Sequence, residues 1–288
     1  WEKHHKALAK FIHKFGSKNI FEIGGGHGVL AMNYLAIQED AHWAILEANP
    51  TPKYNHKQIS FQKGIFDEHC NVDSSVDTIV HSHLFEHTFE PKIFLEQLYK
   101  HLPLNGYTIF SVPYLEQQIR ENFTYCLGFE HTFFLNEVFI EYLLSISGFK
   151  LIDKKIHENN HSIFYCAKKI KKNDQHLEVP LKYNEYLELF KNYFAYNKNK
   201  VDEYNKLIQN TEKPIYLFGA HAASQYLISY GLQTKKIINI IDNDKNKCHK
   251  RLYGTKLTVQ SPSILSKHES AYVLLRQGVF NKEIKKDI

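Results

Sequence analysis

The sequence has few of the residues that bind structural zinc or form disulfides, because only 4 of its 288 residues are cysteine. Cys70, Cys126, Cys166 and Cys248 lie far apart, and no two of them form a Cys-x-x-Cys pair. Neither a compact zinc knuckle nor a disulfide framework is therefore indicated. We expect reduced thiols and no metal site.

Long apolar runs are also missing. No stretch approaches the roughly 18 uninterrupted apolar residues that a membrane helix needs, and the first residues lack the charged, apolar and small-residue order of a signal peptide. We therefore expect no membrane span and a cytoplasmic protein. The chain begins at Trp1 and not at a methionine, which leaves room for a preceding segment.

Charge of one sign is not in strong excess. The chain has 36 Lys and Arg against 31 Asp and Glu, a formal net charge of +5, and the basic residues are scattered. This excess is too small to indicate a nucleic-acid partner. The 18 histidines are expected to lie mostly on a solvated surface. With 43% hydrophobic residues, the chain can bury one large core or two modest ones.

Strand and helix patterns alternate through the first part of the chain. Apolar strands are predicted at 19–23, 43–47, 78–81, 107–112, 149–155 and 162–167, and helices at 29–37, 91–101 and 136–147. This order predicts an α/β fold with a doubly wound, mostly parallel sheet. The last two strands are close enough in sequence to pair antiparallel.

The pattern breaks after residue 168 in a polar, lysine-rich stretch. A helical segment at 183–208 follows, and a second strand, glycine, helix and strand series runs from 215 to 241. We therefore predict a large first domain and a second, smaller α/β domain. The predicted parts are a cofactor-binding domain at 1–170, a linker with a connecting helix at 171–212, and a Rossmann-like substrate-side domain at 213–288.

A glycine turn follows the first strand. Gly24, Gly26 and Gly28 occupy alternate positions where the strand ends and a helix begins. Glycine there permits positive φ and lets a ligand approach the backbone. Glu47 closes the next strand, where an acid in this fold accepts hydrogen bonds from the two ribose hydroxyls. Together these residues predict a nucleotide-like ligand.

The details of the turn favour one ligand over another. A dinucleotide fingerprint would have its third glycine where this chain has Val29, and Glu22 lies two residues before the turn. An acid at that position can accept a hydrogen bond from an α-amino group. S-adenosylmethionine carries this amine and lacks the diphosphate that the third glycine helps to accommodate. The sequence therefore favours S-adenosylmethionine over NAD.

Residues 22–28 resemble the first motif, Glu-x-Gly-x-Gly-x-Gly, of the class I S-adenosylmethionine-dependent methyltransferases. The resemblance continues to about residue 168. It implies a methyltransferase with S-adenosyl-L-methionine as cofactor and Glu47 as ribose acceptor. It also implies that residues 63–67 bracket adenine, with Asp67 a candidate acceptor for the exocyclic amine.

In the same family pattern, Ser82 and His83 begin a loop that lines the cofactor. Two alternatives stay open within this part of the chain. Asp67 either binds adenine or caps a helix or turn. Glu86 and His87, in the loop of Ser82, either take part in catalysis or serve as scaffold.

Residues 129–135 resemble the Glu-His stretch of the sugar C-methyltransferases. This implies His131 as general base, with Glu130 orienting it or binding substrate; the alternative is a buried His131 that caps the following helix. Residues 215–224 and 239–244 resemble the C-terminal domain of those enzymes. The resemblance implies a small polar acceptor held between two domains, such as a nucleotide-activated sugar or another precursor of a surface glycan or secondary metabolite.

Departures from that family leave the acceptor open. Its N-terminal zinc-binding module is not found before the first motif, and Phe129 stands where the family commonly has histidine. An oxygen, nitrogen or phosphate-type acceptor is therefore an alternative to carbon.

Two other classes of function also stay open. One is a dinucleotide-dependent oxidoreductase or sugar-processing enzyme, since Gly219 and Asp242 repeat the glycine and acid order, and the other is a non-catalytic cofactor-binding module. The sequence does not indicate an oligomeric state.

Overall fold

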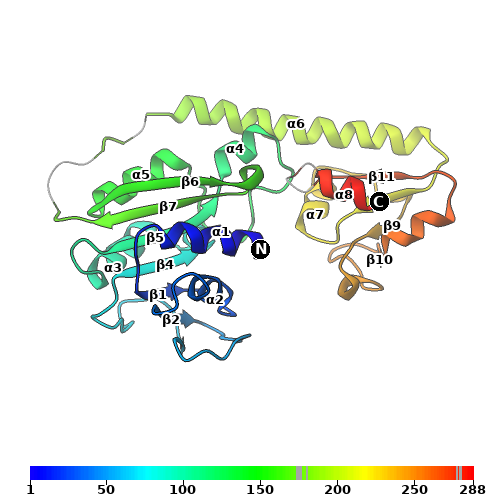
Figure 1. The fold of residues 1–288 in the computed structure, drawn as a ribbon. Coiled ribbons are helices and arrows are strands. Elements are labelled where there is room, and N and C mark those ends of the chain that lie inside the picture. The colour runs from blue at the N-terminus through cyan, green and yellow to red at the C-terminus, as the bar shows by residue number, and fades with distance from the viewer. Residues whose placement is uncertain (173–176, 180, 277, 279–280) are drawn as a thin grey trace. The chain divides into compact units, whose positions relative to one another are not determined.

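The computed structural model describes residues 1–172, 177–179, 181–276, 278 and 281–288. The chain forms two compact units (Figure 1). The first unit comprises Trp1–Glu116 and Phe129–Leu181, and the second comprises Gln117–Gly128 and Lys182–Ile288. Among the described residues, no helix combines the length and the apolar character needed to cross a membrane.

The first unit is built on a seven-stranded sheet with the order β3-β2-β1-β4-β5-β7-β6. Its strands are β1 (Asn19–Ile23), β2 (His42–Glu47), β3 (Ile59–Lys63), β4 (Thr78–Ser82), β5 (Tyr107–Pro113), β6 (Phe149–His157) and β7 (Ser162–Lys169). All pairs are parallel except those of β7, which runs antiparallel to both β5 and β6. The predicted mostly parallel sheet with an antiparallel final pair is confirmed.

Helices cover both faces of this sheet. They are α1 (Glu2–His13), α2 (Val29–Leu35), α3 (Pro91–His101), α5 (Glu137–Ile146) and the short η1 (Phe85–His87) and η2 (Glu158–Asn160). Alternate residues of a strand point to opposite faces, so Ile20 packs in a cluster with α1 and α2, whereas Phe21 packs in a cluster with α3 and α5. The doubly wound arrangement follows, and the loops after β1, β2 and β4 meet at one edge of the sheet.

The second unit contains a four-stranded sheet with the order β10-β9-β8-β11, all parallel. Leu217 and Ile240 of this sheet pack with Val201 and Leu227 of two helices. Its elements are α6 (Tyr183–Asn210), β8 (Ile215–Phe218), α7 (Ala222–Ser229), β9 (Ile237–Ile241), η3 (Lys245–Lys247), β10 (Val259–Gln260), η4 (Pro262–Lys267), β11 (Tyr272–Leu274) and α8 (Asn281–Asp287). The predicted smaller α/β unit is therefore present.

The division into units differs from the sequence-based boundaries. Residues 117–128, which include most of α4 (Leu115–Arg120), group with the second unit. Within that unit, the Tyr226 hydroxyl donates to the Leu127 carbonyl, and the Tyr193 hydroxyl donates to the Thr124 carbonyl at 3.3 Å. The predicted connecting helix is α6, and residues 173–176 and 180 of the predicted linker lie outside the described residues.

Candidate functional site

The glycine turn after β1 adopts the conformation that its sequence predicts. Gly24, Gly26 and Gly28 have φ values of 78°, 48° and 75°. Gly25 is needed for a different reason. A Cβ atom on Gly25 would lie 2.7 Å from Glu22 Oε2 and 2.7 Å from Cγ2 of Ile45. The missing side chain therefore leaves space for the Glu22 carboxylate beside the turn.

Glu22 is a buried acid beside this turn. Its residue is only 4% exposed, and its Oε2 accepts a hydrogen bond from Trp43 Nε1 at 2.8 Å. Burial, with a smaller contribution from the charge of Glu47, raises the pKa of Glu22 to about 7 against the opposing effect of the Trp43 hydrogen bond. Glu22 also lines a cavity of about 450 Å³. It is therefore a strong acceptor placed at a cavity wall.

Glu47, at the end of β2, is tied to the same turn. Its Oε2 accepts from the Gly26 backbone N–H at 3.1 Å, and its Oε1 accepts from the Asn49 N–H at 3.0 Å. Each carboxylate oxygen keeps a second lone-pair site for a ligand hydroxyl. Glu47 lines a second cavity, of about 260 Å³, whose wall is mainly apolar and includes Phe66 and Phe94.

The two cavities adjoin, because Gly24 and His87 line both of them. The smaller one combines apolar walls with the carboxylate of Glu47. The larger one combines the glycine turn with the buried carboxylate of Glu22, a hydrogen-bond acceptor. S-adenosylmethionine needs this combination, because its adenosine requires a partly apolar cavity and its methionine part requires an adjoining polar one. The residues present fit that cofactor.

Ser82 and His83 lie in the wall of the larger cavity. Ser82 Oγ lies 2.9 Å from Ser111 Oγ, and His83 has a left-handed φ of 49°. Asp67 lies on an exposed turn and accepts the N–H of His69 at 2.9 Å. Asp67 is not among the residues that line the two cavities. In the structure it caps a turn, and its contact with adenine stays a prediction.

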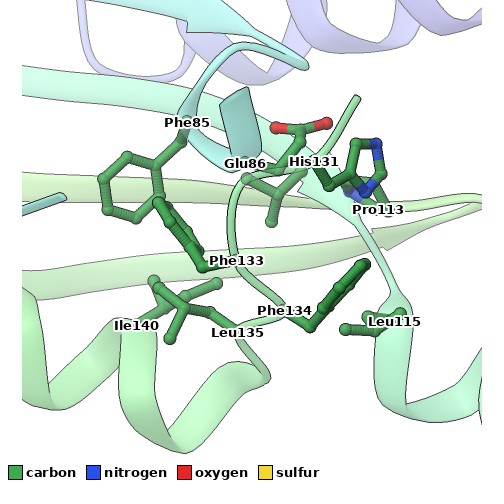
Figure 2. A pocket seen from close by; sticks show the side chains of 10 residues that line it. Phe85, Glu86, Pro113, Leu115, His131, Phe133, Phe134, Leu135 and Ile140 are labelled. Atoms are coloured by element: carbon green, nitrogen blue, oxygen red, sulfur yellow. The ribbon is translucent and has the colours of Figure 1, made fainter. Parts of the chain in front are cut away.

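Glu86, His87 and His131 form a compact polar cluster, in which one side-chain atom of each lies within 4.8 Å of the others. Figure 2 shows Glu86 and His131 at the polar end of a small apolar pocket that includes Phe85 and Phe133. Backbone contacts hold the His131 segment here. The Thr132 N–H donates to the Glu86 carbonyl at 3.0 Å, and His87 Nδ1 lies 3.0 Å from the Glu130 carbonyl.

The surroundings of His131 favour its neutral form. Burial lowers the pKa of His131, and the charge of Glu86 opposes this effect. A neutral imidazole can accept a proton, as a general base must. The side chain of Glu130 is exposed but lines the larger cavity together with His131. Glu86, whose role the sequence left open, is buried in this cluster. In the sequence, its position next to His87 was the feature that made it a candidate.

The second unit repeats the arrangement of glycine turn and acid. Asp242 Oδ2 accepts from the Ala220 N–H at 2.7 Å, as Glu47 does from Gly26. Here, however, a Cβ on Gly219 would lie 3.0 Å from Nε2 of His221, so an imidazole lies against the turn. Lys247 Nζ also lies 3.1 Å from Asp242. The protein's own side chains thus occupy the positions beside this glycine and this acid.

Comparisons with known proteins agree with the geometry. Residues 1–154 match a family model described as a methyltransferase domain, and residues 156–287 match one described as a C-methyltransferase C-terminal domain. A search of curated proteins found no significant match.

Several solved structures are similar to part of the chain. One is the 1,6-didemethyltoxoflavin-N1-methyltransferase of Burkholderia thailandensis, 13% identical, with a TM-score of 0.47 over 58% of this chain and 78% of that one. Another is an S-adenosylmethionine-dependent methyltransferase from Aquifex aeolicus, 17% identical, with a TM-score of 0.46 over 57% and 89%. A third, from Mesorhizobium loti, is 12% identical, with a TM-score of 0.45 over 57% and 96%.

The methyltransferase model covers more than half of the chain, including the glycine turn, Glu47 and the segment of His131. This match decides against the dinucleotide-dependent oxidoreductase. The chain belongs to the family of class I methyltransferases, enzymes that use S-adenosyl-L-methionine as cofactor.

Proposed function

We propose that this methyltransferase acts on a carbon atom of a small polar acceptor, namely a nucleotide-activated sugar with a carbonyl group next to that carbon. One observation carries the proposal. The imidazole of His131, whose pKa is lowered by burial, lines the same cavity as Glu22 and the glycine turn. The match of residues 156–287 to a C-methyltransferase C-terminal domain supports carbon as the acceptor atom.

The chemistry explains why a base matters. When bound, S-adenosylmethionine supplies a methyl group whose bond to the sulfonium breaks with its electrons left on sulfur. A carbon acceptor is a poor nucleophile until it loses a proton, and a neighbouring carbonyl makes that proton acidic. His131 accepts the proton, and the electron pair of the former C–H bond forms the new bond to the methyl carbon. The cavity holds the two reactants close together.

The remaining residues of the site bind and orient. Glu130, with its exposed side chain on the cavity wall, binds the acceptor or orients His131. Glu22 accepts from the α-amino group and Glu47 from the ribose hydroxyls. The proposed cofactor-binding set is Glu22, Gly24, Gly26, Gly28, Glu47, Asp67, Ser82 and His83.

An activity assay tests the proposal. The full chain is incubated with S-adenosylmethionine and either nucleotide-activated keto sugars or the corresponding sugars reduced to alcohols. We expect methylation of the keto sugars alone, with NMR placing the new methyl group on carbon. His131→Gln should lower turnover by about 10²–10⁴-fold, the usual contribution of a general base, while its affinity for S-adenosylhomocysteine stays unchanged.

The matched control is His69→Gln, at a histidine whose side chain is 85% exposed, which should keep full activity. A methyl group on oxygen or nitrogen, or full turnover by the His131 variant, would contradict the proposal. Tight binding of S-adenosylhomocysteine without turnover of any sugar would support the non-catalytic alternative.

A further inference from the structure

Three histidines that are distant in sequence meet beside the site. His4 comes from α1, His83 from the loop after β4, and His161 from the turn before β7. One ring nitrogen of each lies within 4.8 Å of the others. The ring centroids are 5.2 Å apart for His4 and His83, 5.6 Å for His83 and His161, and 5.8 Å for His4 and His161.

His4 is the residue that fold stability alone does not explain. It is only 3% exposed, and neither of its ring nitrogens has a hydrogen-bond partner among the described residues. A buried polar group without a partner costs about 1–3 kcal/mol. Two further imidazoles lie around it, since the ring centroids of His5 and His157 are 5.6 Å and 5.3 Å from that of His4. A bound metal ion would use one of these nitrogens of His4.

His83 is held in an orientation that suits a metal ligand. Its Nδ1 lies 3.2 Å from Glu86 Oε1, and Glu86 is only 7% exposed. Histidines that bind metals commonly donate their other ring N–H to such a carboxylate, which fixes the ring and its tautomer. The opposite nitrogen, Nε2, lies 3.1 Å from Ser162 Oγ, and the same hydroxyl lies 2.5 Å from His161 Nδ1. Ser162 thus joins two of the three rings.

We infer that His4, His83 and His161 bind one divalent transition-metal ion of the zinc class. Imidazole nitrogen is a ligand that such ions favour. Two nitrogens that each bind one zinc at about 2.0–2.1 Å lie about 3.4 Å apart in a tetrahedral site. The three ring nitrogens now lie within 4.8 Å of one another and would move closer on binding the ion. Three protein ligands leave a fourth position for water or for an oxygen of a bound molecule.

This site was not expected from the sequence, which predicts no metal site and mostly solvated histidines. Because His83 also lines the larger cavity, the ion would stand at its wall. It would join α1, the loop after β4 and the turn before β7 through residues that the sequence separates widely. The inference does not depend on the acceptor proposed above.

Metal titration of the full chain tests the inference. The protein is stripped with a chelator and titrated with Zn²⁺ by calorimetry, and with Co²⁺ by its visible absorption. We expect one equivalent bound, nitrogen-type Co²⁺ spectra and a higher Tm with zinc. Glu86→Gln should weaken zinc binding by about 10–100-fold, as loss of an orienting carboxylate does. His4→Ala should weaken it more than that.

Two matched controls localise the ion. His13→Ala, on an exposed residue of the same helix, should bind zinc as the unchanged protein does. So should His131→Ala, which removes a member of the neighbouring Glu86, His87 and His131 cluster. His161→Ala serves as a second ligand variant if His4→Ala fails to fold. Absence of a stoichiometric site, loss of zinc with His131→Ala but not with the ligand variants, or weak binding that no single histidine changes would overturn the inference.

Discussion

The indole Nε1 of Trp43 donates a hydrogen bond of 2.8 Å to the carboxylate of Glu22, across the adjacent strands β1 and β2. This bond is the partner that the sequence did not reveal for the acid before the glycine turn. It supplies one hydrogen bond to a carboxylate that is otherwise deeply buried. The pH dependence of stability should therefore report on Glu22.

Glu22→Gln should stabilise the protein at alkaline pH. Burial first, and the charge of Glu47 in addition, raise the pKa of Glu22 to about 7 from its ordinary 4.5, against the Trp43 bond. Folding then favours the protonated acid. The loss in free energy of unfolding that Glu22 causes is therefore absent below pH 4.5 and is complete once the pH exceeds about 7. Compared with the unchanged protein, the variant should gain up to about 3 kcal/mol between pH 5 and pH 8. Thermal unfolding at the two pH values measures this gain, and an equal difference at both would contradict it.

Gly25→Ala should destabilise the first unit through crowding. The new Cβ would meet Glu22 and Ile45 at 2.7 Å, and overpacking of this kind costs about 1–3 kcal/mol. Part of this destabilisation should vanish in a Glu22→Ala background, because the free-energy effects of substitutions at contacting residues are not additive. Gly16→Ala is the control, since its left-handed φ of 67° is strained but no atom lies within 4 Å of its Cβ. Its cost should be the same in both backgrounds when free energies of unfolding are compared.

Glu47→Ala should weaken cofactor binding. The carboxylate of Glu47 faces the smaller cavity and is the proposed acceptor of the ribose hydroxyls. Loss of a hydrogen bond to a charged group costs about 1.5–3 kcal/mol, which corresponds to about a 10–150-fold higher Kd for S-adenosylhomocysteine. Glu96→Ala, on a surface helix where Glu96 pairs only weakly with Lys92 at 3.9 Å, should leave the Kd unchanged in calorimetry. If the Glu47 variant bound S-adenosylhomocysteine as tightly as the unchanged protein does, Glu47 would not be a cofactor-binding residue.

The pH profile of turnover should report on His131. Burial lowers the pKa of His131 below its ordinary 6.5, although the charge of Glu86 opposes this. Because the neutral ring is the proposed base, kcat should fall as the pH decreases through that lowered pKa, and the acid limb should have its midpoint below 6.5. Glu86→Gln should move the midpoint lower still, since it removes the opposing charge. A profile that His131→Gln leaves unchanged would argue against this base.

Asp242→Ala should destabilise the second unit. Burial raises the pKa of Asp242, but hydrogen bonds from the Asp244 and Ala220 backbones and from Lys247 outweigh it and hold the pKa below its ordinary 3.8. The carboxylate therefore contributes stability above pH 3.8 that is lost as the pH falls through the lower, folded-state pKa. We expect a loss of about 1.5–3 kcal/mol at pH 7 and a smaller one at pH 3. Asp202→Ala, on the exposed side of α6, should show no loss at either pH by thermal unfolding.

Some elements could be predicted closely because their local pattern is strong. The predicted bounds of β1 and α3 are those of the structure, since a largely apolar run marks the strand and an initial proline marks the helix. The edge strand β3 (Ile59–Lys63) was missed, because it is only partly buried and its residues carry little apolar signal. The two-residue β10 and the three-residue β11 are too short for any periodicity to mark them.

The sequence by itself determined the class of fold, the glycine turn and the acid that closes the next strand, because these depend on neighbours along the chain. Only the tertiary structure decided that Glu86 joins His131, that residues 117–128 belong with the second unit, and that His4, His83 and His161 meet. The order of strands in the sheet sets which loops lie side by side. That order brings together residues whose distance in sequence carries no sign of their contact.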